Sequence, residues 1–308
     1  MEDRDGWIWY DGDFVPWRDA RVHVLTHTLH YGMGVFEGVR AYRSDEDMAI
    51  FRLQDHTQRL FNSARMMDIK MPYTKQQLNE AQKEVLRRNN LNTANTAYIR
   101  PMIFYGAEGM GLHTNELKVH AIVAAWEWGA YLGEENMHRG ISVKVSSIAR
   151  YSVKTAMCRA KANGYYINSM LALQEAQRHG YDEALMPDVD GYLAEGSGEN
   201  IFILSKGVLY TPDLGCVLDG ITRRTIMELA RAELGLEVIE KRITRDQAYI
   251  ADEVFFTGTA AEVTPIRKID ERQIADGTRG PITEKLQSLY ADVVTGRNER
   301  YRKWLEFI

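Results

Sequence analysis

Lys161 lies in the run CRAKANGYY, where small side chains stand on both sides of its amine. Ala160 and Ala162 leave room around the amine, and an apolar-periodic helix is expected to follow the run. A lysine in an uncrowded, desolvated pocket gives up its proton more readily and can attack a carbonyl carbon. The chain holds other lysines, so the hypothesis of a nucleophilic Lys161 depends on the groups that accompany it.

Acidic and anion-binding residues accompany this lysine in the second half of the chain. Glu195 lies in LAEGSGENIF, which by itself also fits a solvated hairpin. Gly220, Ile221 and Thr222 in DGITR end a loop and open a helix, whose first amides can bind an anion or can simply be capped. Thr259 in TGTAA is a second donor. An amine, a carboxylate and a phosphate site together are typical of pyridoxal phosphate chemistry, in which an acid keeps the pyridine nitrogen protonated.

Tyr98 and Arg100 in AYIRP point to one face of an expected strand, because side chains alternate along a strand. That face could orient an anionic substrate, although a surface ion pair is the simpler role for the arginine. Other motifs indicate no further chemistry. His23, His27 and His30 have helical spacing but no HExxH or nearby carboxylate, so packing is expected. The glycine groups GMGVFEG and GSGEN lack the third glycine of a dinucleotide fingerprint.

The elements that must position these residues alternate between strand and helix patterns. A hairpin is predicted from Trp7 to Trp17 around Asp11-Gly12, and hairpin turns are predicted at Asp190-Gly191 and Lys206-Gly207. Further strands are predicted at residues 49–53, 96–105, 119–128 and 141–147. Helices are predicted at residues 53–69, from a capping box at Thr74 and Gln77, at 164–180, at 220–235 and at 281–296. The pattern predicts an α+β chain.

Composition favours a globular cytoplasmic protein. The 308 residues carry a formal charge of −5 without a basic block, which argues against nucleic acid and anionic membranes as partners. The sequence has no apolar run of membrane-spanning length, and its acidic start lacks the order of a signal peptide. Cys158 and Cys216 stand alone, so neither a disulfide framework nor a zinc site is expected. We expect no metal.

Eight motifs occur in the order and approximate spacing of the branched-chain amino acid aminotransferases, which the chain resembles from about Trp7 to Arg267. They are HYGMGVFEGVRAY, YIRPMIFYG, GMGL, WGAYLG, AKANGYY, EGSGEN, DGITR and GTAAEVTP. The resemblance implies the two-domain fold type IV architecture of pyridoxal phosphate enzymes, as in D-amino-acid aminotransferase, with the cofactor between the domains. We expect a small α+β domain at 1–132, an interdomain loop at 133–139, where the sequence is polar, and a larger β-rich domain at 140–308.

The resemblance also implies roles for individual residues. Lys161 would bond the aldehyde of pyridoxal 5′-phosphate and later move the proton of the substrate Cα. Glu195, rather than Glu199, would meet the pyridine nitrogen, and Tyr166 would meet the ring hydroxyl oxygen. The remaining cofactor contacts would come from Arg59, Leu218, Ile221, Thr222 and Thr259. The substrate pocket would comprise Tyr31, Phe36, Gly38, Tyr98, Arg100, Trp128, Tyr131, Thr259 and Ala260, with Met110 and Leu112 from a second subunit.

The expected reaction transfers the amino group of L-leucine, L-isoleucine or L-valine to 2-oxoglutarate in a ping-pong cycle. The smallest active unit would be a homodimer, and a higher homo-oligomer stays open. Relatives that act on D-amino acids carry Arg-x-His where this chain has Tyr98-Ile99-Arg100, which favours L-substrates. The rivals are an (R)-amine or D-amino-acid transaminase, an aminodeoxychorismate lyase, and a catalytically silent pyridoxal phosphate binding protein. Animal members of the family carry a redox CxxC motif that is missing here.

Overall fold

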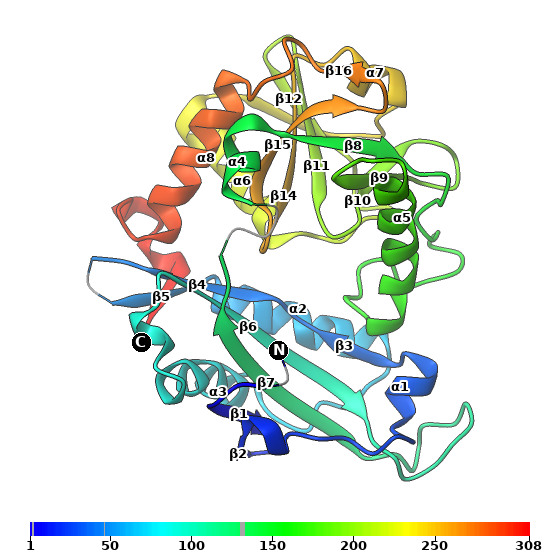
Figure 1. Cartoon of the computed structure of the whole chain (residues 1–308), viewed down its shortest axis with the longest axis vertical. Helices are drawn as coiled ribbons and strands as arrows, with labels where there is room; N and C mark the ends of the chain where they lie inside the picture. The colour runs from blue at the N-terminus through cyan, green and yellow to red at the C-terminus, as the bar shows by residue number, and fades with distance from the viewer. Residues whose placement is uncertain (2, 46, 130–132) are drawn as a thin grey trace. The chain divides into compact units, whose positions relative to one another are not determined.

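The computed structural model describes residues 1–308 except residues 2, 46 and 130–132, and it divides into two compact units (Figure 1). The first unit comprises residues 1–129, 160–165 and 293–308, and the second comprises 130–159 and 166–292. Lys161 thus belongs to the first unit, although the strand before it in sequence belongs to the second. The C-terminal residues 293–308 also return to the first unit.

The first unit is built on an eight-stranded sheet in which every pairing is antiparallel. The strand order is β17-β5-β4-β6-β7-β1-β2, and β3 pairs with β6. The strands are β1 (Trp7–Tyr10), β2 (Asp13–Pro16), β3 (Gly34–Phe36), β4 (Val39–Arg43), β5 (Met48–Phe51), β6 (Thr96–Tyr105), β7 (Val119–Glu127) and β17 (Leu305–Phe307). The first hairpin turns at Asp11 and Gly12, both with positive φ, as the sequence predicts.

Two amphipathic helices pack on the strands of the first unit, α2 (Leu53–Met66) and α3 (Lys75–Arg88). Their apolar residues form one core with the strands, for example Leu60 of α2 and Val85 of α3 against Ile99 of β6. The predicted capping box at the start of α3 is present, with Thr74 and Gln77 bonding each other's backbone amides. The short α1 (His27–Tyr31) ends at Gly32, which adopts the left-handed conformation.

The second unit contains a closed ring of strands, in the order β10-β9-β8-β15-β14-β11 and back to β10. β12, β13 and β16 extend this sheet. The strands are β8 (Ile141–Val145), β9 (Glu183–Pro187), β10 (Leu193–Gly196), β11 (Asn200–Ser205), β12 (Val208–Thr211), β13 (Glu237–Glu240), β14 (Glu253–Gly258), β15 (Glu262–Ile269) and β16 (Arg272–Gln273). The ring closes at the pair Glu195 and Asn200, directly beside the predicted site. Val143, Ile203 and Phe256 belong to its apolar core.

Helices of the second unit pack on this sheet, α5 (Tyr166–Arg178) on β9 and α6 (Ile221–Leu234) on β13 and β14. Two further helices are α7 (Arg245–Tyr249) and α8 (Pro281–Val294). Glu253 accepts hydrogen bonds from the backbone amides of Ile282 and Thr283 at the start of α8. Residues 134–139, expected as part of an interdomain loop, form the short α4 (Glu134–Arg139), which ends at Gly140 with positive φ. No helix in the described ranges is long and apolar enough to cross a bilayer.

Candidate active site

The backbone of Lys161 is fixed between β3 and α2 of the first unit. Its N–H donates to the hydroxyl of Ser63 at 3.0 Å, and its carbonyl accepts from the N–H of Phe36 at 3.1 Å. Ala162 adds a bridge to Val35. The Nζ atom lies 5.1 Å from the centroid of the Phe36 ring, so the amine rests over an aromatic face. The backbone of Lys161 is therefore held by hydrogen bonds, and the end of its side chain lies over the ring of Phe36.

Arg59, predicted to bind phosphate, is buried on α2 and pairs with Glu37. Its Nε and Nη2 donate to the two carboxylate oxygens of Glu37 at 2.6 and 2.9 Å. His56, one turn earlier on α2, donates from Nδ1 to the same carboxylate at 2.8 Å. Burial alone would raise the pKa of Glu37, but Arg59 and His56 together hold it well below its usual range. The carboxylate is therefore ionised, and it orients the arginine.

Tyr98 and Arg100 share a face of β6, as the alternation of side chains predicts. Nη2 of Arg100 donates to the Tyr98 hydroxyl at 3.2 Å, and its guanidinium lies 4.8 Å from the centroid of Phe36. Trp128 meets Tyr98 edge-on, with ring centroids 4.7 Å apart. Nε of Arg100 is buried and has no hydrogen-bond partner among the described residues. The aromatic residues Phe36, Tyr98 and Trp128 thus form a wall that carries the Arg100 guanidinium.

Gly38 lies against this wall and allows the close approach of Tyr98. A Cβ atom at position 38 would stand 1.9 Å from the Tyr98 hydroxyl, far inside van der Waals contact. Arg40, two residues on, donates to the carbonyls of Trp128 and Gly129 at 3.0 and 2.9 Å. Arg40 thereby holds the segment directly after β7, which carries Trp128. Tyr131 lies outside the described residues.

Met110 and Leu112 lie on the loop between β6 and β7, with 49% and 84% of their surface exposed. The loop is tied to α1, because the N–H of Gly111 donates to the Tyr31 hydroxyl at 3.3 Å and its carbonyl lies 2.7 Å from Nε2 of His27. Tyr31 is itself 43% exposed. The structure thus joins Tyr31 to the loop that carries Met110 and Leu112. Of the three histidines expected to pack, His27 is buried, whereas His23 and His30 are exposed. No cluster suited to a metal occurs among the described residues.

Glu195 in the second unit is buried at the ring closure and is surrounded by donors. Arg150 pairs with its Oε1 at 2.5 Å, while the Asn200 side chain and the Leu218 N–H donate to its Oε2 at 3.2 and 3.0 Å. Burial would lower the pKa of Arg150, but the charge of Glu195 raises it above its usual value. Glu199 instead bonds the N–H of Gly198. These partners fix the Glu195 carboxylate as an anion.

The predicted phosphate site of the second unit is the N-terminus of α6. Ile221 and Thr222 are the first residues of the helix and are buried. A Cβ on Gly220 would stand 1.9 Å from Oδ1 of Asn200, so this turn needs glycine. Arg223 donates to Glu240 at 2.6 Å and to the Pro212 carbonyl at 2.8 Å, which anchors the helix. The first-turn amides can receive an anion.

The other predicted residues of the second unit are placed by the ends of its elements. Tyr166 begins α5, and Thr259 and Ala260 follow the end of β14. Leu218 lies in the loop before α6 and is tied to Glu195 through its N–H. The predicted residues thus gather in two groups, one on each unit.

Sequence reasoning missed several partners of the predicted residues, among them Glu37, Arg40, Ser63 and Arg150. Glu37 stands between Phe36 and Gly38 in the sequence, so a charged residue inside an apolar motif was the available signal. Ser63 and Arg150 carry no such signal, because each meets its partner through a contact distant in sequence.

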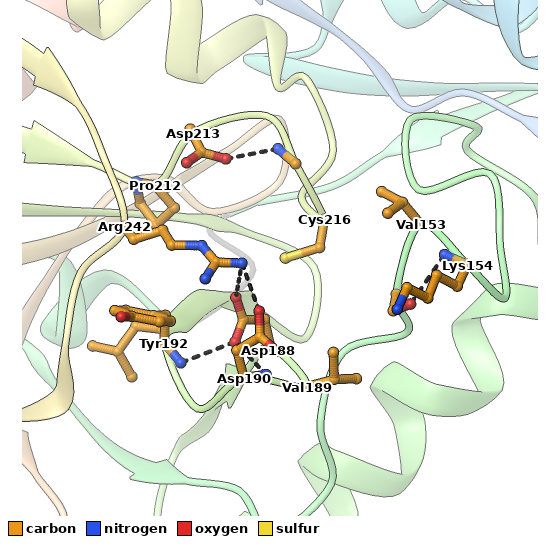
Figure 2. Close-up of a pocket in the computed structure, with 13 residues that line it drawn as sticks. Val153, Lys154, Asp188, Val189, Asp190, Tyr192, Pro212, Asp213, Cys216 and Arg242 are labelled. Atoms are coloured by element: carbon orange, nitrogen blue, oxygen red, sulfur yellow. Dashed lines mark hydrogen bonds and ion pairs between the residues drawn. The ribbon is translucent and has the colours of Figure 1, made fainter.

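A separate cavity of about 220 Å³ in the second unit carries no catalytic group (Figure 2). Arg242 at its edge pairs with Asp190 at 2.7 Å and Asp188 at 3.8 Å. Cys216 lines the cavity, and burial raises the pKa of its thiol to about 12, so the reactive thiolate is scarce at neutral pH. The ion pairs brace the turn around Asp190 that the sequence predicts.

The chain matches one family model and many known proteins. The model described as amino-transferase class IV matches residues 34–269. A branched-chain-amino-acid aminotransferase of Pseudomonas aeruginosa is 62% identical over 99% of this chain and 98% of the relative. The enzyme of that name from Escherichia coli K12 is 45% identical over 97% and 96%.

Solved structures resemble the chain along nearly its whole length. The branched-chain amino acid aminotransferase of Escherichia coli has a TM-score of 0.95 at 44% identity, covering 98% of this chain and 99% of that one. The PLP form of the enzyme from Thermobaculum terrenum has a TM-score of 0.91 at 35% identity, covering 98% of each.

Proposed function

The chain belongs to the class IV aminotransferase family, and we propose that it transfers the amino group of branched-chain L-amino acids to 2-oxoglutarate with pyridoxal 5′-phosphate as its cofactor. The predicted α+β, fold type IV architecture is confirmed. We also propose a cytoplasmic location and a role for each predicted site residue. Its substrates are L-leucine, L-isoleucine and L-valine, and its products are the branched 2-oxo acids and L-glutamate.

The residues present fit pyridoxal phosphate by the chemistry of their donors. Lys161 offers an amine over an aromatic ring, and Glu195 offers a carboxylate that Arg150 keeps ionised. The α6 N-terminus and Arg59 offer amides and a cation to a phosphate. When bound, the cofactor supplies an aldehyde that receives the amino group and a ring that accepts electrons.

Each residue then has a definite task. Lys161 would be the catalytic base: its Nζ would take the proton from the substrate Cα and, with the cofactor bound, would return it to C4′ of the cofactor. Glu195 holds a proton on the pyridine nitrogen, and Asn200 and Arg150 keep its carboxylate in place. Tyr166 donates to the ring hydroxyl oxygen, and Leu218 packs on the ring. The Thr259 and Ala260 amides, with the Tyr98 hydroxyl, bind the substrate carboxylate.

The aromatic wall that carries Arg100 is the observation on which the substrate assignment rests. Phe36, Tyr98 and Trp128 offer an apolar surface to a branched side chain, and each buried methylene contributes roughly 0.8 kcal/mol. Arg100, whose buried Nε lacks a partner among the described residues, can pair with the distal carboxylate of glutamate. One wall thereby serves both substrates of the cycle.

Substrate assays test this assignment against its rivals. The purified enzyme is given L-leucine, D-alanine or an (R)-arylalkylamine with 2-oxoglutarate, and glutamate formation is measured. We expect turnover with L-leucine and little with the other donors. Preferred turnover of D-alanine or the amine would identify a different transaminase of the same fold, and absence of all turnover would identify a silent binding protein.

We propose a homodimer as the smallest active unit, because both units expose large apolar side chains. They include Val24, Leu29 and Leu112 in the first unit and Val153, Ile167 and Met170 in the second. Met110 and Leu112 lie on a loop that is bonded to Tyr31, and we propose that these two side chains enter the pocket from the partner subunit. Light scattering should give at least twice the chain mass of 35.3 kDa. An active monomer would contradict this.

A further inference from the structure

One face of α2 links the predicted catalytic lysine to the predicted phosphate anchor. His56, Arg59 and Ser63 follow each other at helical spacing and point to the same side. His56 and Arg59 hold Glu37, while Ser63 holds the backbone of Lys161. Glu37 is also joined to Lys161 through its neighbour Phe36, whose N–H donates to the lysine carbonyl. This face of α2 therefore contributes to the placement of both Arg59 and Lys161.

Glu37 is completely buried, and its carboxylate accepts hydrogen bonds from Arg59, His56 and the Gly38 N–H. Two parallel hydrogen bonds, from Nε and Nη2, set both the plane and the heading of the guanidinium. A third bond from His56 and a longer one from the Gly38 N–H, at 3.3 Å, hold the carboxylate from other sides. Burial lowers the pKa of His56, so it is neutral and adds no charge beside Arg59.

A guanidinium has five N–H groups, and Glu37 engages two of them. The pairing with Glu37 by itself therefore does not prevent Arg59 from also contacting a phosphate. We propose that Glu37 is a positioning residue that aims Arg59 at the phosphate of the cofactor. This inference rests on the proposed role of Arg59 as a phosphate anchor. Glu37 itself touches neither the cofactor nor the substrate in this scheme.

The loss of Glu37 should weaken phosphate binding if Glu37 positions Arg59, but should strengthen it if Glu37 acts only through its negative charge. The Glu37 carboxylate repels a phosphate, so removal of its charge would tighten phosphate binding if Arg59 acted only as a point charge. If Glu37 holds Arg59 in the orientation that binds phosphate, then without Glu37 the guanidinium must become ordered when the phosphate binds, and this ordering lowers the affinity. Ordering one long side chain corresponds to about a 2-fold to 12-fold loss of affinity.

The test measures the affinity of the apoenzyme for pyridoxal phosphate and for pyridoxal, which lacks the phosphate, by absorbance titration. Glu37→Gln keeps the shape, but its single oxygen cannot serve both Arg59 and His56. We expect its affinity for pyridoxal phosphate to fall about 3-fold to 10-fold. Its affinity for pyridoxal should stay within about twofold. Glu37→Asp, which keeps the charge but has a shorter reach, gives the same comparison if the amide variant does not fold.

Two further variants separate the ways in which this inference could fail. Glu253→Gln removes another buried carboxylate, at the far end of β14 from Thr259, and should change neither affinity. Arg59→Gln should weaken pyridoxal phosphate alone, and adding Glu37→Gln to it should cause no further loss. If Arg59→Gln has no effect, the proposed anchor is wrong. If Arg59→Gln has its effect while Glu37→Gln tightens binding, leaves it unchanged or weakens both ligands equally, Glu37 does not position Arg59.

Discussion

Replacing Arg100 by methionine should separate the two substrates that share one pocket. The guanidinium lies over Phe36 and Tyr98 at 4.8 and 5.3 Å and donates to the Tyr98 hydroxyl, yet its buried Nε has no partner among the described residues. The distal carboxylate of glutamate or 2-oxoglutarate would supply that partner. Methionine keeps an apolar side chain of similar length and removes the charge, so the carboxylate would be left unpaired.

The size of the effect follows from the environment of Arg100. Arg100 is half-buried, so breaking its pair with the distal carboxylate should cost less than breaking a fully desolvated pair. We expect a loss of binding free energy of about 2 to 4 kcal/mol. That corresponds to a roughly 30-fold to 900-fold weaker interaction with glutamate and 2-oxoglutarate. Leucine makes no charge contact with Arg100 and should lose less than about 1 kcal/mol, which is the scale of one neutral hydrogen bond.

Separate half-reactions provide the assay, because each substrate is then measured without the other. The pyridoxal form is titrated with L-leucine and, in a second experiment, with L-glutamate, and the change in cofactor absorbance is followed. The ratio of the two apparent affinities should shift strongly against glutamate in Arg100→Met. An equal loss for both substrates would refute the reasoning, since Arg100 would then support the fold or the shared α-carboxylate site.

Three further variants test the catalytic and pocket residues. Lys161→Ala should still bind the cofactor through its phosphate contacts but show no transamination, and near-normal turnover would remove Lys161 from its role. Glu195→Gln should slow the L-leucine half-reaction, because an amide cannot hold a proton on the pyridine nitrogen; an unchanged rate would exclude it from the site. Gly38→Ala should raise the KM for L-leucine, because the added Cβ would lie 1.9 Å from the Tyr98 hydroxyl and must displace it. An unchanged KM would show that the pocket tolerates this displacement.

Local elements were predictable from the sequence because local patterns determine them. β6 occupies the predicted residues 96–105, and the capping box at Thr74 starts α3. Gly235 ends α6 in the left-handed conformation that its sequence signals. Periodicity and capping are read over a few residues, so no knowledge of the fold was needed.

Long-range pairing could not be read in this way. The closure of the ring between β10 and β11 and the return of residues 160–165 to the first unit depend on contacts between distant segments. The same holds for the site. Lys161 and Glu195 were predicted as site residues through their motifs, whereas Arg150 meets Glu195 from a loop far earlier in the chain. A charged residue alone does not show which of many opposite charges it will meet on folding.

The visible absorption spectrum of the purified protein, recorded before and after addition of L-leucine without any acceptor, shows whether the bound cofactor accepts the amino group of L-leucine. If the chain is a branched-chain transaminase with its cofactor on Lys161, L-leucine should bleach the visible band of the bound cofactor, and 2-oxoglutarate should restore it. D-alanine should leave the band almost unchanged. A spectrum that L-leucine does not alter, in protein that demonstrably contains pyridoxal phosphate, would contradict the account.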